Sequence, residues 1–244
     1  MHPGDDSPIG MVGFDADDTL WRSQDYFEDA QRRFEAILGQ YIDVDGMAAR
    51  LYAVEKHNIA FFGYGVKGMV LSMIEAAVEL TDGRVSSRDL SRIVEMGKEL
   101  LRHPVELLPG ITEAVAAIAA ELPLVLITKG DLFHQEAKVR DSGLARFFPR
   151  IEIVSEKDEA TYARLFREFD IDPRRFVMIG NSLRSDIVPV LALGGWGVHM
   201  PYHLTWAHER DAAMGDDTRR FRSVDCPAQL VQAVADIRAG TLAG

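Results

Sequence analysis

Short apolar segments alternate with longer amphipathic segments through most of the chain. The apolar segments have the length of strands, and the segments between them repeat apolar positions at helical spacing. The predicted strands are Ile9–Phe14, Leu124–Thr128, Ile151–Val154, Phe176–Gly180 and Trp196–Met200. The helices predicted between them are Thr112–Glu121, Leu132–Ser142, Glu159–Phe169 and Ser185–Leu193. This alternation is typical of an α/β fold with a Rossmann-like, doubly wound parallel sheet.

The interval after the first strand breaks this alternation. Residues 22–104 contain no strand pattern, and apolar positions such as Phe27 and Phe34 repeat at helical spacing. The helices predicted there are Gln24–Leu38, Met47–Phe61, Lys67–Leu80 and Ser86–Leu101. The insert is too long for a simple crossover between strands. We therefore predict an α/β core domain from residues 1–21 and 105–244, and an inserted all-helical cap domain from residues 22–104.

Composition limits the partners and the location of the protein. The chain has 244 residues, of which 47% are hydrophobic, and a net charge of −11. This charge disfavours nucleic-acid binding, which needs Lys and Arg against phosphates, but it is compatible with a small anionic substrate in one pocket. No apolar run reaches the length of a membrane span, and we find no signal-peptide pattern. We expect a cytoplasmic protein with no nucleic-acid or membrane partner, and the oligomeric state stays open, with a homodimer as one possibility.

The C-terminal part carries fewer signals. The single cysteine, Cys226, cannot form an internal disulfide, and we expect it to be a partly buried thiol. A short apolar segment at Phe221–Val224 and a final helix at Pro227–Arg238 are expected to pack at the edge of the sheet.

An acidic segment, Phe14-Asp15-Ala16-Asp17-Asp18-Thr19-Leu20, follows the first predicted strand. In extended geometry Asp15 and Asp17 project to the same side, so we expect their carboxylates to meet beyond the carboxyl end of the strand, where open α/β sheets bind ligands. One carboxylate can attack phosphorus, and the other can protonate a leaving alcohol and later deprotonate water. For this segment alone, an acidic loop that caps a helix is the alternative.

Further polar residues follow three later strands. Thr128 and nearby main-chain N–H groups end the second strand and can hold phosphate oxygens at a helix N-terminus. Lys157 follows the third strand and can neutralise charge on a transferring phosphoryl group. After the fourth strand, in Gly180-Asn181-Ser182-Leu183-Arg184-Ser185-Asp186, Asp186 can join Asp15 in binding Mg²⁺, which prefers oxygen ligands. Helix capping by Thr128 and a solvated Lys157 are the alternatives for these residues taken singly.

Taken in order, Asp-x-Asp-x-Thr, Thr, Lys and Gly-Asn-Ser-x-x-x-Asp resemble the four motifs of the haloacid dehalogenase-like (HAD) superfamily, over residues 9 to about 200. The resemblance implies a core with strand order 5-4-1-2-3 and a C1-type cap between the first and second motifs. It implies that Asp15 is the nucleophile and a magnesium ligand, and that Asp17 is the general acid/base whose main-chain carbonyl also binds the metal. Thr128 and Lys157 then bind the phosphoryl group, and Asp186 completes the metal site.

Two positions bear on the activity. Superfamily members that hydrolyse carbon–halogen bonds generally lack an aspartate two residues after the nucleophile, so Asp17 favours a phosphatase, whose alkoxide leaving group benefits from general acid help. Asn181 stands where many members have an acidic residue; its side-chain oxygen can still ligate weakly, but the lost negative charge predicts lower metal affinity. The predicted function is a magnesium-dependent phosphomonoester hydrolase that acts on a small soluble substrate through an aspartyl-phosphate intermediate.

Other functions stay open at this point. A phosphotransferase or mutase of the same superfamily would pass the phosphoryl group to a sugar, and a haloacid dehalogenase would cleave a carbon–halogen bond. A catalytically silent phospho-ligand-binding protein is the non-enzyme alternative, and Asn181 makes it more credible. A receiver-like signalling module is disfavoured, because its phosphorylated aspartate would be expected later in the chain. The sequence does not identify the phosphate ester.

Weaker signals complete the set of candidate residues. Tyr64 and Lys67, in the glycine-rich turn between the second and third cap helices, can contact the leaving group of the substrate, or the turn can be a flexible connection. Ala16 and Lys129 are added to the predicted substrate-binding residues. Trp21 follows the acidic motif, where either a hinge or ordinary packing is expected.

A histidine-bearing stretch follows the last predicted core strand. The spacing of His199, His203 and His208 fits no strong metal motif. We expect a loop that lines the rim of the pocket.

Overall fold

The computed structural model describes residues 9–209 and 219–240, and its contacts divide the chain into two compact units. The first unit comprises Met1–Arg22, Val105–Lys129 and Lys138–Gly244, and the second comprises Ser23–Pro104 and Gly130–Ala137. Helix α6 (Leu132–Asp141) begins in the second unit and ends in the first. Across the described ranges, no helix is long and apolar enough to cross a membrane.

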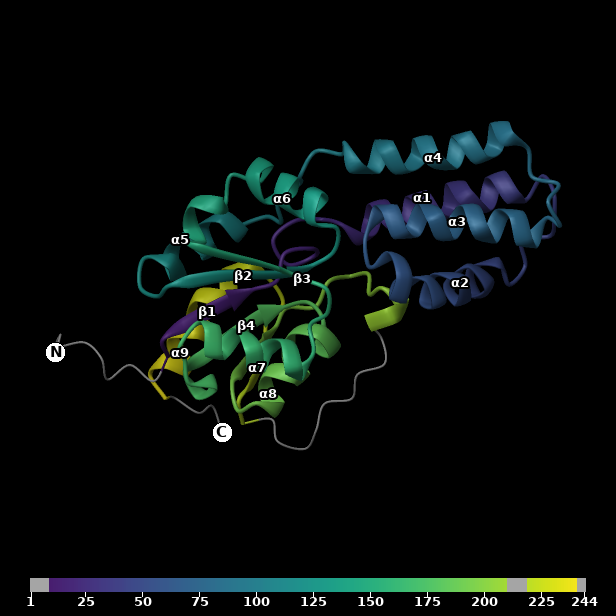
Figure 1. Ribbon diagram of the computed structural model, residues 1–244. Coiled ribbons are helices and arrows are strands. Elements are labelled where there is room, and N and C mark those ends of the chain that lie inside the picture. Colours follow the sequence, from purple (N-terminus) through teal and green to yellow (C-terminus); the bar gives the residue numbers. More distant parts are fainter. Residues whose placement is uncertain (1–8, 210–218, 241–244) are drawn as a thin grey trace. The chain divides into compact units, whose positions relative to one another are not determined.

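The first unit is built on a six-stranded parallel sheet with the order β3-β2-β1-β4-β5-β6. Figure 1 labels β1 to β4 of this sheet. The strands are β1 (Met11–Phe14), β2 (Leu124–Lys129), β3 (Arg150–Val154), β4 (Phe176–Gly180), β5 (Trp196–His199) and β6 (Phe221–Ser223). The α/β class and the doubly wound sheet are confirmed, and β6 extends the sheet beyond β5 as the expected edge segment. Because β1 lies between β2 and β4, the strand order reverses there, and its carboxyl end is the topological switch point where such sheets bind ligands.

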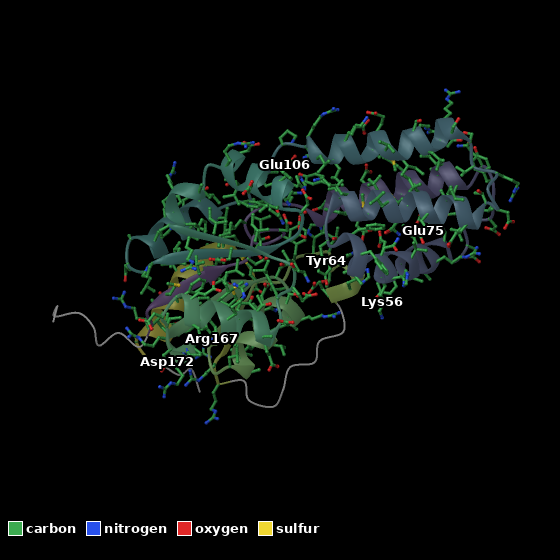
Figure 2. All side chains as sticks on the ribbon, viewed as in Figure 1. Lys56, Tyr64, Glu75, Glu106, Arg167 and Asp172 are labelled. Atoms are coloured by element: carbon green, nitrogen blue, oxygen red, sulfur yellow. The ribbon has the colours of Figure 1, made fainter. Side chains whose placement is uncertain are left out.

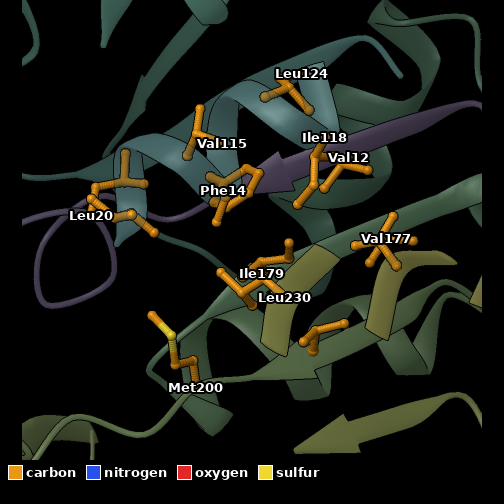
Figure 3. Packing of buried hydrophobic residues seen from close by; sticks show 14 of the residues in the cluster. Val12, Phe14, Leu20, Val115, Ile118, Leu124, Val177, Ile179, Met200 and Leu230 are labelled. Carbon is orange, nitrogen blue, oxygen red and sulfur yellow. The ribbon is translucent and has the colours of Figure 1, made fainter. Parts of the chain in front are cut away.

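Alternate strand residues enter two hydrophobic cores on opposite faces of the sheet. Val177 and Ile179 of β4 pack in one core with α5 and α9, part of which Figure 3 shows. Phe176 and Met178 of the same strand pack in the other core with α7 and α8. The helices are α5 (Ile111–Ala119), α7 (Glu159–Glu168), α8 (Val188–Ala192) and α9 (Leu230–Arg238). Covered faces on both sides explain why these strands read as continuous apolar runs.

Short helical turns connect these elements. They are η1 (Ala145–Phe147), η2 (Pro173–Arg175), η3 (Leu183–Ile187), η4 (Ala207–Glu209) and η5 (Pro227–Gln229). Two features of these connections correct the predictions made from the sequence. The helix predicted at Ser185–Leu193 is the π-helical turn η3 followed by α8, because the Ser182 side chain caps this turn at its start and Pro189 opens α8. Cys226 is exposed rather than partly buried, since Val224 and Pro227 on either side of it point into the protein.

The second unit contains four helices around its own core. They are α1 (Gln24–Leu38), α2 (Met47–Phe62), α3 (Val66–Leu80) and α4 (Ser87–Leu101). The predicted amphipathic pattern buries one side of each helix, with Phe34, Leu51, Met73 and Ile93 among the residues of the shared core. Whether this unit acts as a cap stays a prediction.

Candidate active site

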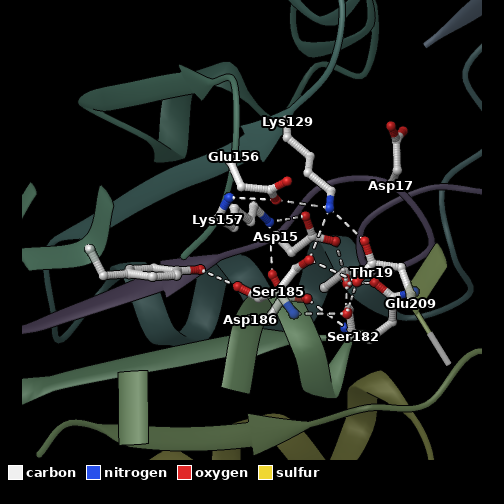
Figure 4. Close-up of polar contacts among 12 residues, drawn as sticks. Asp15, Asp17, Thr19, Lys129, Glu156, Lys157, Ser182, Ser185, Asp186 and Glu209 are labelled. Carbon is white, nitrogen blue, oxygen red and sulfur yellow. Dashed lines mark hydrogen bonds and ion pairs between the residues drawn. The ribbon is translucent and has the colours of Figure 1, made fainter. Parts of the chain in front are cut away.

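Lys157 joins two buried carboxylates at the carboxyl ends of neighbouring strands. The main-chain N–H of Asp15 donates to the carbonyl of Ile179 at 2.9 Å, which ties the end of β1 to β4. The Lys157 ammonium contacts Asp15 Oδ1 and lies 2.7 Å from Asp186 Oδ1 (Figure 4). Asp15, Lys157 and Asp186 are 7%, 3% and 1% exposed. The fold therefore brings these three predicted residues together, and Lys157 is not a solvated lysine.

Two carboxylates share one ammonium in this cluster. Burial raises the pKa of Asp15, with Lys157 opposing the shift and Asp186 adding to it. Burial also raises the pKa of Asp186. For Lys157, burial acts to lower the pKa, but the charges of Asp15 and Asp186 outweigh it and hold the pKa above its ordinary value. The cluster thus keeps a cationic lysine and can accept further positive charge, because one carboxylate lacks an ammonium of its own.

The second oxygen of Asp15 is held by Thr19. Thr19 Oγ1 donates to Asp15 Oδ2 at 3.0 Å, and the main-chain N–H of Asn181 donates to Thr19 Oγ1 at 3.1 Å. Thr19 is fully buried. Thr19 is the last residue of the Asp-x-Asp-x-Thr motif, and no role was predicted for it from the sequence. The motif spacing was the available signal. With Lys157 on one oxygen and Thr19 on the other, the Asp15 carboxylate is fixed in one orientation.

Asp17 does not face Asp15, which corrects the expectation from extended geometry. β1 ends one residue before Asp15, and Asp18 adopts a left-handed conformation with φ of 62°, so the backbone turns there. The Asp17 carboxylate accepts from the indole N–H of Trp21 at 2.7 Å and pairs with Lys138 Nζ at 2.5 Å. Figure 4 shows it directed away from the Asp15 cluster. An acid/base role requires this carboxylate to leave both partners.

The oxygens around Asn181 match the needs of a hard divalent cation. The side-chain amide atom that faces Asp15 lies 3.1 Å from Asp15 Oδ2 and 3.2 Å from the main-chain oxygen of Asp17. Adjacent ligands of octahedral Mg²⁺ lie roughly 3 Å apart, because each is about 2.1 Å from the ion. If this atom is the amide oxygen, it and the two neighbouring oxygens can all coordinate one cation. If it is the amide nitrogen, it donates hydrogen bonds to those oxygens directly. Asn181 therefore fits both a metal-bound and a metal-free site.

The acidic residues alone would not make a metal site. In the described part of the chain, no group of three or more His, Cys, Asp and Glu side chains is placed to hold a metal. Mg²⁺ commonly uses only one or two carboxylates and keeps several waters. The predicted ligands include only two carboxylates, and their binding of Mg²⁺ stays a prediction. They are the carboxylates of Asp15 and Asp186, the amide of Asn181 and the main-chain oxygen of Asp17.

Thr128 and Lys129 end β2 in different surroundings. Thr128 is 1% exposed and directly precedes Lys129, the last residue of β2. Lys129 Nζ lies 2.5 Å from Glu209, 2.9 Å from Ser185 Oγ and 3.3 Å from Glu156. These partners of Lys129 were not predicted from the sequence. They carry no motif signal, and Glu209 lies 80 residues from Lys129 along the chain.

Three further predicted residues complete the candidate set. Ala16 is fully buried, and its carbonyl accepts main-chain N–H groups of the turn after β1. Tyr64 lies in the connection between α2 and α3 (Figure 2). Lys67 of α3 pairs with Asp131 at 2.9 Å and lies over the ring of Phe133. Tyr64 and Lys67 belong to the second unit, and their contact with a substrate stays a prediction.

The three histidines, of which His199 ends β5 and the other two follow it, have separate neighbours. His199 Nε2 lies 3.0 Å from the main-chain oxygen of Asn181, and burial lowers the pKa of His199. The ring of His203 lies against Tyr202, and that of His208 lies against Trp206. His199 thus supports the main chain of the Asn181 turn.

Comparisons with known proteins agree with the motifs. A family model described as haloacid dehalogenase-like hydrolase matches residues 9–194. The crystal structure of a haloacid dehalogenase-like family hydrolase from Xanthomonas campestris is 53% identical, with a TM-score of 0.87, and the match covers 98% of this chain and 96% of that chain. No curated protein matches the chain.

More distant structures share the fold but differ in chemistry. A predicted phosphoglycolate phosphatase from Haemophilus somnus is 15% identical, with a TM-score of 0.61 and coverage of 94% of this chain and 99% of that one. A 2-haloacid dehalogenase from Pseudomonas syringae is 19% identical, with a TM-score of 0.62 and the same coverage of 94% and 99%. Since one fold carries both chemistries, the activity of this chain has to be argued from its residues.

Proposed function

Because the chain belongs to the haloacid dehalogenase-like hydrolase family, we propose that it is a magnesium-dependent phosphomonoester hydrolase acting on a small soluble phosphate ester. The observation that carries the proposal is the Asp15 carboxylate at the switch point, held by Lys157 and Thr19, with a second aspartate two residues later. A fixed carboxylate beside a buried ammonium suits attack on an anionic phosphoryl group.

The reaction divides into two transfers. Asp15 attacks phosphorus, and the bond from phosphorus to the ester oxygen breaks. Asp17, once it has left Trp21 and Lys138 and is protonated, gives its proton to the departing alkoxide. Asp17 then takes a proton from water, whose oxygen attacks phosphorus. The bond from phosphorus to the Asp15 oxygen breaks, which releases inorganic phosphate and free Asp15. Lys157 and the N–H groups near Thr128 offset the phosphoryl charge throughout. Asp15, Asp186, Asn181 and the main-chain oxygen of Asp17 would hold Mg²⁺, which supplies further neutralisation of that charge.

Asp17 supports the phosphatase over the dehalogenase. A halide leaves without a proton, so carbon–halogen hydrolysis gives Asp17 no task in the departure step. A phosphotransferase would use the same residues and differ only in the acceptor. Product analysis separates it from a hydrolase.

Phosphate release from p-nitrophenyl phosphate, with and without Mg²⁺, tests the proposal. We expect magnesium-dependent release, its loss in Asp15→Asn, and a rate reduced roughly 10²- to 10⁴-fold in Asp17→Asn. Asp141→Asn changes an aspartate whose side chain is 57% exposed, and it should match the unmodified protein. Halide release from 2-chloropropionate, or full activity in Asp15→Asn, would overturn the proposal. Nitrophenol released without an equal amount of phosphate would indicate a transferase.

A further inference from the structure

Glu209 places a carboxylate in the active site from beyond the segment that the family model matches. The match ends at residue 194, and Glu209 is the last residue of η4, which follows β5. Its side chain is only 11% exposed. The segment is also tied down one residue earlier, where the main-chain carbonyl of His208 accepts from Arg184 Nη1 at 2.5 Å. A buried carboxylate is costly unless polar or charged groups compensate it, so its partners indicate what it holds.

Each oxygen of Glu209 has partners of its own (Figure 4). Oε1 lies 2.5 Å from Lys129 Nζ. Oε2 accepts from Ser185 Oγ at 2.7 Å and also from Ser182 Oγ. The carboxylate therefore joins the end of β2 to the start of η3.

The same turn carries Asp186. Ser182 Oγ accepts the main-chain N–H of Ser185 at 3.0 Å, and the main-chain N–H of Ser182 donates to Asp186 Oδ2 at 3.0 Å. Because Glu209 binds both serine hydroxyls, it influences the orientation of the Asp186 carboxylate. Glu209 reaches that carboxylate only through the turn.

Lys129 is held from two sides. Besides Glu209, its ammonium lies 3.3 Å from Glu156 Oε1, and the same oxygen accepts the main-chain N–H of Lys157 at 2.9 Å. The Lys129 side chain is 15% exposed. Two carboxylates neutralise this ammonium locally, which suits it to bridging protein groups more than to binding phosphate.

We propose that Glu209 is a positioning residue, which fixes Lys129 and the turn bearing Asp186 so that the groups around Asp15 keep their places. The inference rests on the proposed hydrolase function. Lys129 is then part of the same support, and not a phosphate ligand. Loss of the support lowers turnover through geometry, because a displacement of about 1 Å near the reacting groups can cost roughly 10² in rate.

A double-mutant cycle of Glu209→Gln and Lys129→Met tests the proposal. Each single variant should lower kcat roughly 10- to 100-fold, while KM for p-nitrophenyl phosphate and Ki for inorganic phosphate stay within about twofold. The double variant should be no slower than the slower single variant, because it removes both charges of the Glu209–Lys129 pair together. Glu156, which also loses Lys129, has a side chain that is 42% exposed to solvent. Glu168→Gln removes exposed ion pairs with Arg164, at 2.8 Å, and Arg150, at 3.6 Å, and is the matched control with unchanged kinetics.

Two outcomes overturn the proposal. If the kcat losses of the two single variants multiply in the double variant, Glu209 and Lys129 act independently. A roughly tenfold rise of Ki for phosphate in Lys129→Met alone would show that Lys129 is a phosphate ligand. Hydrogen exchange gives a readout without turnover. In Glu209→Gln the amides of Ser185 and Asp186 should exchange roughly tenfold faster. Unchanged exchange would show that Glu209 does not position this turn. An unmodified protein that hydrolyses no ester overturns the hydrolase function, while the exchange rates still decide on the support.

Discussion

Two buried aspartates, one in each unit, have the same exposed fraction and opposite shifts in acidity. Asp15 of the first unit and Asp89 of the second are each 7% exposed. Burial raises the pKa of Asp15, whereas hydrogen bonds from Tyr41, Ser86 and Arg92 lower the pKa of Asp89 to about 2. Exposure alone therefore does not set the acidity of a carboxylate; the donors around it do.

The donors also separate a structural site from a functional one. Asp89 accepts from the Tyr41 hydroxyl at 2.5 Å and from Ser86 Oγ at 2.8 Å, and it pairs with Arg92 at 2.9 Å. It has a cation to itself and completes the start of α4. Asp15 shares one lysine with another carboxylate. A buried carboxylate whose charge is incompletely compensated, such as Asp15, indicates a site that can bind a ligand. A fully compensated one, such as Asp89, indicates a residue that stabilises the fold.

The largest effect is expected from removing the shared ammonium. Lys157→Met leaves Asp15 and Asp186 buried and mutually repelling, so we expect phosphatase activity to fall by at least roughly 10³-fold and stability by about 3–5 kcal/mol. Steady-state kinetics and thermal unfolding measure the two losses.

Lys98→Met is the matched control for this variant. Lys98 pairs with Glu95 at 2.5 Å, but its side chain is 48% exposed, so its removal should cost less than about 1 kcal/mol. Equal losses of stability in the two variants would contradict the claim that the buried ammonium shared by two carboxylates stabilises the protein more than an exposed one.

A smaller effect is expected from adding charge at the same site. Asn181→Asp places a carboxylate 3.1 Å from Asp15 Oδ2, so the metal-free protein should be less stable and its Mg²⁺ affinity roughly tenfold higher. Calorimetric titration with Mg²⁺ and melting temperatures with and without the ion measure both changes.

Asn58→Asp controls for a buried carboxylate elsewhere. Asn58 is 4% exposed and donates to Glu75 at 2.6 Å, so this change should also destabilise the protein, but Mg²⁺ should not restore its stability. Equal Mg²⁺ affinity in Asn181→Asp and in the unmodified protein would show that this side chain does not face the ion.

The sequence predicted those parts of the site that follow from strand ends. Apolar runs located five strands of the sheet, and parallel strands bring their carboxyl ends to one edge, so the meeting of Asp15, Lys157 and Asp186 was predictable. The direction of Asp17 was not, because it depends on the left-handed Asp18 and on Lys138, a partner 121 residues away. Side-chain periodicity no longer applies once a strand has ended.

Glu209 was out of reach for a related reason. Nothing in the sequence around it separates it from other surface carboxylates, and the contacts that bury it come from Lys129, Ser182 and Ser185. The exposure of Cys226 was not predictable for the same reason, because the direction of its side chain follows from the packing of its neighbours. Local patterns predict elements, but a contact between distant loops needs the fold.

The smallest effect is expected from the compensated carboxylate. Asp89→Asn keeps the shape of the side chain but removes the charge that Tyr41 and Arg92 stabilise, so the melting temperature should fall by roughly 3–8 °C. Phosphatase kinetics should be unchanged. Asp29→Asn, which removes an ion pair of an aspartate with a 56% exposed side chain, is the control and should leave the melting temperature unchanged.

The pH dependence of this last variant tests the cause of its effect. The pKa of Asp89 is about 2 in the folded protein and 3.8 ordinarily, so the charged form stabilises the fold above the higher value. That contribution is lost as the pH falls through the lower one. The difference in melting temperature between the unmodified protein and Asp89→Asn should therefore be constant from about pH 7 to 5 and shrink towards pH 2. Calorimetry at fixed ionic strength measures it. A difference that persists at pH 2 would attribute the loss to hydrogen-bond geometry and not to charge, and the contrast with Asp15 would then rest on geometry alone.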